Sequence, residues 1–265
     1  MDLSIIIVTF NSESVIGDCL DALGKWAGRT LVVDNASKDN SVALVKKRGV
    51  ELKELSQNTG FARGANTGAR LAKGKVLCFL NPDCLPSEEL LKRGYSAVNQ
   101  ARALAAVPFL YETGGLKTDG RQPGYTRLKL CHDILSTAYP IKKFDKRIKN
   151  ISGYHDRNWS WPHGACFFIK REVFLKLGGF DSRLFTYMED VDLGYKLWRA
   201  GGGLVQLNHE IRHQTASGSN ISIAHRRWLM TAGRVKYGKL HYGTLWAVML
   251  GMAALPGLVI KGLLK

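Results

Sequence analysis

Acidic residues that could hold a cation, a nucleotide base or a proton occur at three separate places in this 265-residue chain. Asp34 and Asp83 each follow a short apolar run directly, and Glu189, Asp190 and Asp192 stand together in YMEDVDLG. A carboxylate at a strand end can accept the imino N–H of a pyrimidine ring. Carboxylates also supply the oxygen ligands that Mg²⁺ or Mn²⁺ prefers. Three acids within four positions of a basic chain indicate a general base.

Each acidic motif also has a structural interpretation. Asp34 could form an Asx turn that caps the next helix, and Asn81-Pro82-Asp83 has the composition of an ordinary turn. Acids at a helix N-terminus are favoured by the helix dipole. Taken one at a time, the motifs do not decide between chemistry and structure.

Two further segments carry polar groups that could contact a ligand. In QNTGFARGANTGAR, glycines recur every four residues from Gly60 to Gly68, so a helix opening near Phe61 is expected. Arg63 and Asn66 would then lie near one side, where arginine can meet phosphate, although helix packing through small residues explains the glycines equally well. His213, in IRHQTASGSN, could serve as a metal ligand or a phosphate donor.

The elements that position these residues follow from hydrophobic patterning. Short apolar runs alternate with helical spacing, which predicts a mostly parallel α/β sheet with helices on both faces. Ligands bind such sheets outside the carboxyl ends of the strands, where Asp34 and Asp83 are expected. The predicted strands are 4–9, 31–33, 50–55, 76–80, 165–169 and 204–207, and the predicted helices are 15–23, 41–47, 171–177 and 191–200. The stretch 108–161 is irregular and reads as an inserted or variable region.

The charge and the cysteines restrict the partners and the compartment. The chain has 38 basic and 22 acidic side chains, a formal charge of +16. Such a surface attracts nucleic acid, lipid headgroups or a phosphorylated substrate. The five cysteines are scattered without a CxxC pair, which argues against a zinc ribbon or disulfide framework and for a reducing compartment. The first residues read as a strand, not as a signal peptide.

The C-terminal part changes in character after residue 222. Basic residues crowd 226–239, and no charged residue occurs from 242 to 260. That length approaches the roughly 20 residues needed to cross a bilayer, but Pro256 and three glycines disfavour a straight span. We expect an interfacial helix behind a polybasic segment. The alternative is a hydrophobic helix packed on the domain or on a partner.

Taken together, six segments in order resemble the inverting family 2 glycosyltransferases of the GT-A fold. The subgroup most similar contains the rhamnosyltransferase-like enzymes of bacterial cell-surface polysaccharide synthesis. The resemblance covers about residues 3–220 and is most specific from His163 to Gly201. The segments are SIIIVTFNSE, VVDNASKDNS, NTGFARGANTG, FLNPDC, HGACFFIKREVFLKLGGFDSRLFTYMEDVDLGYKLWRAGG and the region of His213.

The resemblance implies a set of nucleotide-binding residues. Asp34 would bind the pyrimidine ring, and Thr9 and Asn11 would line the base and ribose region. Arg63 and Asn66 belong to the segment that approaches the nucleotide. The resemblance then implies a nucleotide-sugar half, 1–107, and an acceptor half, 108–221, and the composition adds a helical membrane-associating segment, 222–265.

The resemblance also implies the catalytic and metal residues. Asn81-Pro82-Asp83 stands where the family has its metal-binding Asp-x-Asp, so Asp83 would hold Mg²⁺ or Mn²⁺, with Asn81 replacing the first acid. His213 would complete the metal or diphosphate site. Asp190 would be the catalytic base, supported by Glu189.

The implied activity is inverting transfer of a sugar, with L-rhamnose as one candidate, from a dTDP- or UDP-sugar. The implied acceptor is a glycan, linked to polyprenyl diphosphate at the cytoplasmic side of the cell membrane. A sugar nucleotidyltransferase would need a Gly- and Arg-rich loop where Phe10-Asn11-Ser12-Glu13 stands. A non-catalytic sugar-nucleotide-binding protein would not need the Glu189-Asp190 pair. Nucleic acid is not expected, because the basic residues form neither a recognition helix nor an aromatic-studded sheet.

Overall fold

The computed structural model describes residues 1–100, 103–113, 115–138, 155–214 and 221–263 of the chain, without the side chains of 138, 157 and 257–263. Its strands are β1 Leu3–Thr9, β2 Thr30–Asp34, β3 Glu51–Glu54, β4 Val76–Leu80, β5 Cys84–Leu85, β6 Ala103–Glu112, β7 Lys117–Thr118, β8 Arg121–Tyr125, β9 His155–Pro162, β10 Cys166–Lys170 and β11 Gly203–His213. Its helices are α1 Ile16–Leu23, the 3₁₀ segment η1 Gly24–Arg29, α2 Ser41–Lys47, α3 Phe61–Leu71, α4 Glu88–Gln100, α5 Arg127–Ala138, α7 Arg171–Lys176, α8 Glu189–Arg199, α9 Ile223–Tyr242 and α10 Thr244–Leu263.

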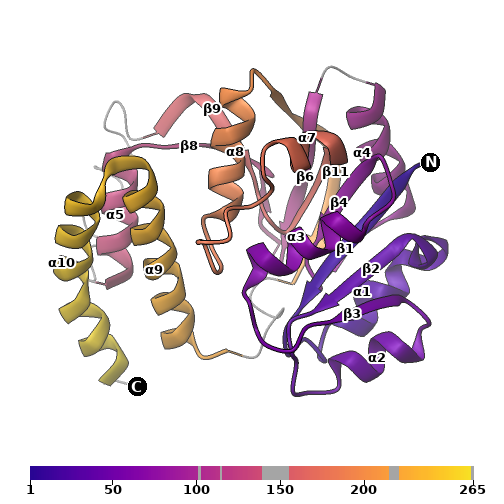
Figure 1. The fold of residues 1–265 in the computed structure, drawn as a ribbon, viewed down its shortest axis with the longest axis horizontal. Helices are drawn as coiled ribbons and strands as arrows, with labels where there is room; N and C mark the ends of the chain where they lie inside the picture. The colour runs from indigo at the N-terminus through magenta and orange to yellow at the C-terminus, as the bar shows by residue number, and fades with distance from the viewer. Residues whose placement is uncertain (101–102, 114, 139–154, 215–220, 264–265) are drawn as a thin grey trace.

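One sheet, formed by strands between Leu3 and His213, organises most of the chain (Figure 1). Its strand order is β3-β2-β1-β4-β10-β6-β11-β5. The first four strands are parallel, β10 runs antiparallel between β4 and β6, and β11 is parallel to β6. The predicted α/β sheet with helices on both faces is therefore present. The carboxyl ends of β1, β2 and β4 lie at the same edge.

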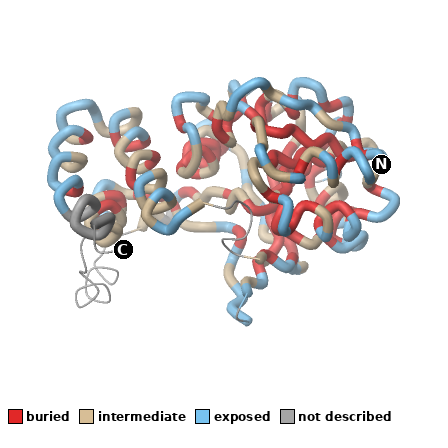
Figure 2. Tube along the Cα trace, turned by 90° about the horizontal axis from the view of Figure 1, so that it is seen from below, coloured by how far each residue is buried: buried red, intermediate tan, exposed pale blue. Residues whose placement is uncertain are grey.

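Alternating side chains of the central strands fill two separate cores. From β1, Ile5 and Ile7 face α1, α2 and α4, whereas Ile6 and Val8 face α3, α7 and α8. Because both faces are covered, these strands are apolar throughout, which is the pattern that predicted them. Figure 2 shows the buried strands enclosed by half-exposed helices.

The interpretation of 108–161 as irregular was wrong for its described residues. This stretch contains the end of β6, the two-stranded β8–β9 sheet and helix α5. Bulged pairing between β8 and β9 hides the regular period from the sequence. The predicted strand 204–207 is also longer than expected, because β11 continues alongside β6 and β5 as far as His213.

Residues 222–263 form two long helices, α9 and α10, that pack on each other and on α5 (Figure 1). A third core joins them to β8, β9 and α8 through Tyr237 of α9 and Ala254 of α10. One face of α10 therefore packs on the domain, which was the alternative to an interfacial membrane helix for residues 242–260. Among the described residues, no helix is long and apolar enough to cross a membrane. The boundary at residue 222 stays a prediction.

A substitution in α4, at the point where this helix contacts β10 of the sheet, tests how tightly the two elements pack. A Cβ at Gly94 would overlap the ring of the fully buried Phe168, so Gly94→Ala should lower the free energy of unfolding by about 1–3 kcal/mol through overpacking. The better helix propensity of alanine recovers up to about 1 kcal/mol of this. Urea denaturation measures the change. The matched control is Gly28→Ala, where a Cβ meets nothing within 4 Å; equal stability of the two variants would contradict the packing described.

Candidate functional site

A cavity of about 800 Å³ lies at the carboxyl edge of the sheet. Its wall includes Val8 near the end of β1, Phe10 just after β1 and Asn35 just after β2, and the loop after β4 adds Asn81 to Asp83. The other walls come from the loops at 58–61, 163–165 and 185–191, from the end of β11, and from α9. Parallel α/β sheets bind ligands at this edge, and the volume suits a small-molecule ligand.

Five of the ten residues predicted for the site line this cavity together: Asn81, Asp83, Glu189, Asp190 and His213. They come from three distant parts of the chain, namely the end of β4, the start of α8 and the end of β11. The other five do not line it: Thr9, Asn11, Asp34, Arg63 and Asn66.

Asp34 and Thr9 lie just behind the cavity wall at the ends of β2 and β1. One oxygen of the buried Asp34 carboxylate accepts a hydrogen bond from the Ser37 N–H at 2.9 Å, which is the Asx turn considered above. Among the described residues, its Oδ1 and the Thr9 hydroxyl are buried without a hydrogen-bond partner. Burying an oxygen unpaired costs free energy, so these two atoms mark a place where a polar ligand group could bind.

Asn66 and Arg63 make contacts within the protein. Asn66 both donates to the Phe180 carbonyl at 2.8 Å and accepts from the Phe180 N–H at 2.9 Å, so its amide fixes the loop after α7 to α3. Arg63 is exposed and donates to the Ser182 carbonyl at 3.5 Å. Asn11 has a left-handed backbone and accepts from the Lys38 N–H at 2.8 Å.

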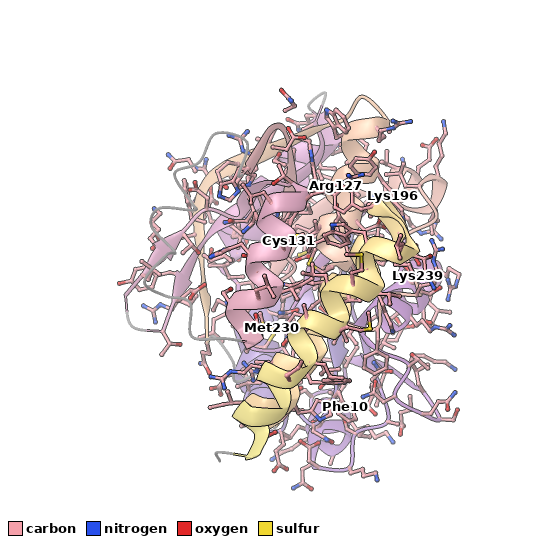
Figure 3. All side chains as sticks on the ribbon, turned by 90° about the vertical axis from the view of Figure 1, so that its left-hand side faces the viewer. Phe10, Arg127, Cys131, Lys196, Met230 and Lys239 are labelled. Carbon is pink, nitrogen blue, oxygen red and sulfur yellow. The ribbon has the colours of Figure 1, made fainter. Side chains whose placement is uncertain are left out.

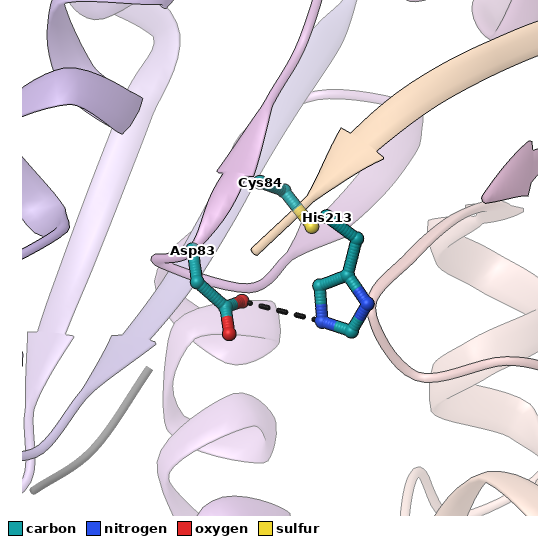
Figure 4. A group of neighbouring side chains, drawn as sticks. All are labelled: Asp83, Cys84 and His213. Atoms are coloured by element: carbon teal, nitrogen blue, oxygen red, sulfur yellow. Dashed lines mark ion pairs between the residues drawn. The ribbon is translucent and has the colours of Figure 1, made fainter. Parts of the chain in front are cut away.

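Asp83 and His213 form a buried pair that could hold a cation (Figure 4). Asp83 Oδ1 lies 3.5 Å from His213 Nε2, and both side chains are over nine-tenths buried. Among the described residues, Asp83 Oδ1 has no hydrogen-bond partner. An orphaned carboxylate oxygen beside an imidazole fits a divalent ion that is also bound by a ligand's phosphate oxygens.

Glu189 and Asp190 are the first two residues of α8, and burial raises the pKa of both carboxyl groups. Burial raises the pKa of Asp190 to about 6, although backbone N–H groups of Val191 and Gly164 stabilise its charged form. Burial, and then the neighbouring Asp190, raises the pKa of Glu189. A carboxylate with a pKa near neutrality can take up a proton as a general base.

The two acidic sites are joined through one short segment before β10. The Gly164 N–H donates to Asp190 Oδ2 at 3.0 Å, and the carbonyl of Ala165 accepts from the Asn81 N–H at 2.8 Å. The segment 164–165 therefore connects the start of α8 to the loop that carries Asp83.

The third acid of the α8 motif, Asp192, has a structural partner. Its Oδ1 lies 3.0 Å from His241 Nε2 of α9, and its Oδ2 lies 2.8 Å from Lys196 Nζ. Burial opposes ionisation of Asp192, but the bonds to His241 and Lys196 outweigh it and lower the pKa. This contact fixes α9 against the helix that carries Asp190. The two residues before the helix, Tyr187 and Met188, have left-handed backbones, a strained conformation common in binding loops.

Several cavity residues were not predicted. His163 stacks on Trp161 at a centroid distance of 6.3 Å and meets His213 edge-on at 6.0 Å. Burial, and then His213, lowers the pKa of His163 to about 4. Tyr125 and Trp161 give the cavity an aromatic wall. The motif HGACFFIK was part of the resemblance to the family, but it gave no indication that the His163 side chain lies in the site.

Helix α9 supplies a second unpredicted wall. The cavity lining includes four of its residues, His225, Arg226, Met230 and Arg234. Figure 3 shows the molecule from the side on which α9 and α10 lie. Arg234 also donates to the Asp133 carbonyl and the Thr137 hydroxyl of α5. The basic residues of 226–239, interpreted as a surface segment, therefore partly face the cavity.

Comparison with known proteins gives a family match. Residues 4–178 match the family described as glycosyl transferase family 2. That range contains the sheet edge, Asp34, Asp83 and the 164–165 segment.

Individual relatives are more distant. An uncharacterised glycosyltransferase of Bacillus subtilis, YfnE, is 26% identical over 241 residues, covering 76% of this chain and 61% of that protein. An N-acetylglucosaminyl-diphospho-decaprenol L-rhamnosyltransferase of Mycobacterium tuberculosis is 50% identical over 46 residues, covering 17% of this chain and 15% of its own. The chain spans between 15% and 62% of the length of the curated relatives that it matches.

A solved structure shares the fold. Glucosyl-3-phosphoglycerate synthase of Mycobacterium tuberculosis, crystallised with Mn²⁺, UDP and phosphoglyceric acid, superposes with a TM-score of 0.59 at 12% identity. The superposition covers 89% of this chain and 77% of that one.

Proposed function

Because the chain belongs to glycosyl transferase family 2, we propose that it transfers a sugar from a nucleoside diphosphate to an acceptor hydroxyl. The observation that carries the proposal is one cavity containing both a cation-binding pair, Asp83 and His213, and a buried carboxylate with a raised pKa, Asp190. Group transfer from a diphosphate needs both, because charge grows on the leaving group while the attacking hydroxyl loses its proton.

The proposed mechanism is a direct displacement with inversion. Asp190 accepts the proton of the acceptor hydroxyl as that oxygen attacks the anomeric carbon from the face opposite the diphosphate. Glu189, whose pKa burial also raises, is the support of Asp190 and not a second base. A divalent cation bound by Asp83 and His213 would neutralise charge on the leaving diphosphate.

The proposed donor is a pyrimidine nucleotide sugar. The unpaired Oδ1 of Asp34 and the unpaired hydroxyl of Thr9 suit the imino N–H and carbonyl oxygens of uracil or thymine. The structural relative named above binds UDP with Mn²⁺. L-Rhamnose, carried by dTDP, is proposed as the sugar on the 46-residue match to the rhamnosyltransferase. Arg63 and Asn66 of α3, and Asn11 after β1, are then assigned to the region that shapes the nucleotide site from outside the cavity wall.

The proposed acceptor is a glycan on polyprenyl diphosphate at the cytoplasmic membrane surface. Helix α10 has an unpartnered apolar face, on which Leu245, Met249 and Met252 are each more than 60% exposed. They recur at helical spacing on the side away from the buried Ala247. Lys239, at the edge of this face in Figure 3, is exposed as well. Apolar insertion with flanking cations suits an anionic membrane surface.

The catalytic role of Asp190 predicts a strong loss of turnover on Asp190→Asn. We expect kcat to fall by about 10²–10⁴-fold, because general-base catalysis contributes that much, while nucleotide affinity persists. In the unaltered protein the base must be deprotonated, so kcat should fall as the pH drops below about 6, and this acid limb should vanish in the variant. Nucleotide release measures both. Asp181→Asn, outside the cavity, is the control; near-normal turnover by Asp190→Asn rules out the base assignment.

The donor site predicts a nucleotide and metal preference. Uridine and thymidine diphosphate sugars should raise the melting temperature in the presence of Mn²⁺ or Mg²⁺, and GDP-sugars should raise it less. Chelation of the metal, or Asp83→Asn, should remove most of the pyrimidine-specific shift, since the cation links the diphosphate to the protein. Thermal shift with a panel of donors measures this. A larger response to GDP-sugars would contradict the assignment of Asp34.

The apolar face of α10 predicts binding to anionic vesicles. Replacing Leu245, Met249 and Met252 together with Gln should abolish co-sedimentation with phosphatidylglycerol vesicles and leave the fold intact, because these side chains are exposed. Val205→Gln, an exposed apolar residue on β11, should bind like the unaltered protein. Undiminished sedimentation of the triple variant would refute membrane docking through this face.

A further inference from the structure

The cation site contains a third potential ligand, the thiol of Cys84. Strand β5 pairs antiparallel with β11 in a register that places Cys84 directly opposite His213, and the Gln214 N–H donates to the carbonyl of Asp83 at 2.9 Å. Side chains of directly opposed residues lie on one face of a sheet about 4.5–5.5 Å apart at Cβ. Strand pairing therefore brings together a carboxylate, an imidazole and a thiol (Figure 4).

The spacing of these groups suits a shared ion. One ligand atom of each residue lies within 4.8 Å of the other two, and all three residues are buried. The 3.5 Å between Asp83 Oδ1 and His213 Nε2 is longer than an ordinary hydrogen bond. It is close to the edge of about 3.4 Å that a tetrahedral ion with ligand bonds of about 2.0–2.1 Å would impose.

We propose that Cys84 is a third metal ligand, which strengthens the preference of this site for Zn²⁺ over Mn²⁺ and Mg²⁺. The proposal rests on the proposed function only in placing a divalent cation at Asp83 and His213. Mg²⁺ and Mn²⁺ favour oxygen ligands and would use Asp83 with phosphate oxygens, whereas Zn²⁺ also accepts thiolate and imidazole. On coordination the thiol releases its proton to solvent, and its 3.4 Å hydrogen bond to the Ala165 carbonyl is lost.

The consequence is competition between ions at the donor site. Zn²⁺ held by three protein ligands would keep a fourth position for water or a phosphate oxygen. It would exclude the more weakly bound Mn²⁺ from the same atoms. Zinc would therefore oppose manganese-supported donor binding. The structural alternative is that Cys84, which is part of the sheet core, is a buried apolar side chain only.

Cobalt substitution tests the ligand directly, without turnover. Co²⁺ added to the full-length metal-free protein should give an intense near-ultraviolet thiolate-to-cobalt charge-transfer band, and Zn²⁺ should displace it. The band should be absent in Cys84→Ala and retained in Cys131→Ala, whose half-buried thiol lies on α5. Titration calorimetry should show the Zn²⁺ affinity of Cys84→Ala reduced by at least about 10–100-fold, since loss of an outer-shell partner alone costs that much. The Mn²⁺ affinity should fall less.

Two results would overturn the proposal: no thiolate band in the unaltered protein, or an unchanged Zn²⁺ affinity in a folded Cys84→Ala. If Cys84→Ala does not fold, the spectrum of the unaltered protein decides the question, with Cys131→Ala confirming that Cys131 is not the source. A cobalt protein without the band that still transfers sugar with Mn²⁺ would refute the third ligand and leave the proposed function standing. If the band is present but no nucleotide sugar binds, the third metal ligand stands and the proposed sugar transfer is refuted.

Discussion

The backbone of Gly164 and Ala165 is the constraint on which the site depends. The Gly164 N–H donates to Asp190, and the Ala165 carbonyl accepts from both the Asn81 N–H and the Cys84 thiol. A Cβ at Gly164 would lie 3.1 Å from Asp190 Oδ2, a tight contact, so glycine lets the strand approach the acid closely. Pairing of β10 with β4 and β6 holds the strand that directly follows this segment. The positions of the two acidic groups are thereby set by a sheet, not by flexible side chains, as positioning a reaction requires.

Residues at strand ends could be predicted from the sequence because the pattern that identifies a buried parallel strand also identifies where it ends. The abrupt stop after Leu80 at Asn81-Pro82-Asp83 placed Asp83 correctly at the cavity. The acidic cluster before a helical pattern did the same for Asp190. His213 could be connected with Asp83 only through the resemblance to a family, because the pairing of β5 with β11 joins segments more than a hundred residues apart.

The predicted residues on helices could not be placed because periodicity does not identify the partner of a helix. Helical spacing correctly put Arg63 and Asn66 near one side of α3, but that side faces the loop at Phe180. Likewise, basic residues in 226–239 looked like a surface segment. Their orientation depends on α5, which lies in a stretch whose strands are bulged and whose pattern is irregular, so Arg226 and Arg234 in the cavity wall were not anticipated.

Arg226 and Arg234 add positive charge to a cavity whose predicted site residues are mainly acidic. In the proposed cation site Asn81 adds no second carboxylate beside Asp83, so an ion that prefers oxygen ligands would complete its coordination with phosphate oxygens of the substrate. A diphosphate that leaves from such a site needs positive charge from elsewhere. In the proposed transfer that charge would come from Arg226 and Arg234 in the cavity wall, the second of which also pairs with Asp133. Because His241 binds Asp192 two residues after Asp190, α9 holds these cations and the helix of the proposed base in one fixed arrangement.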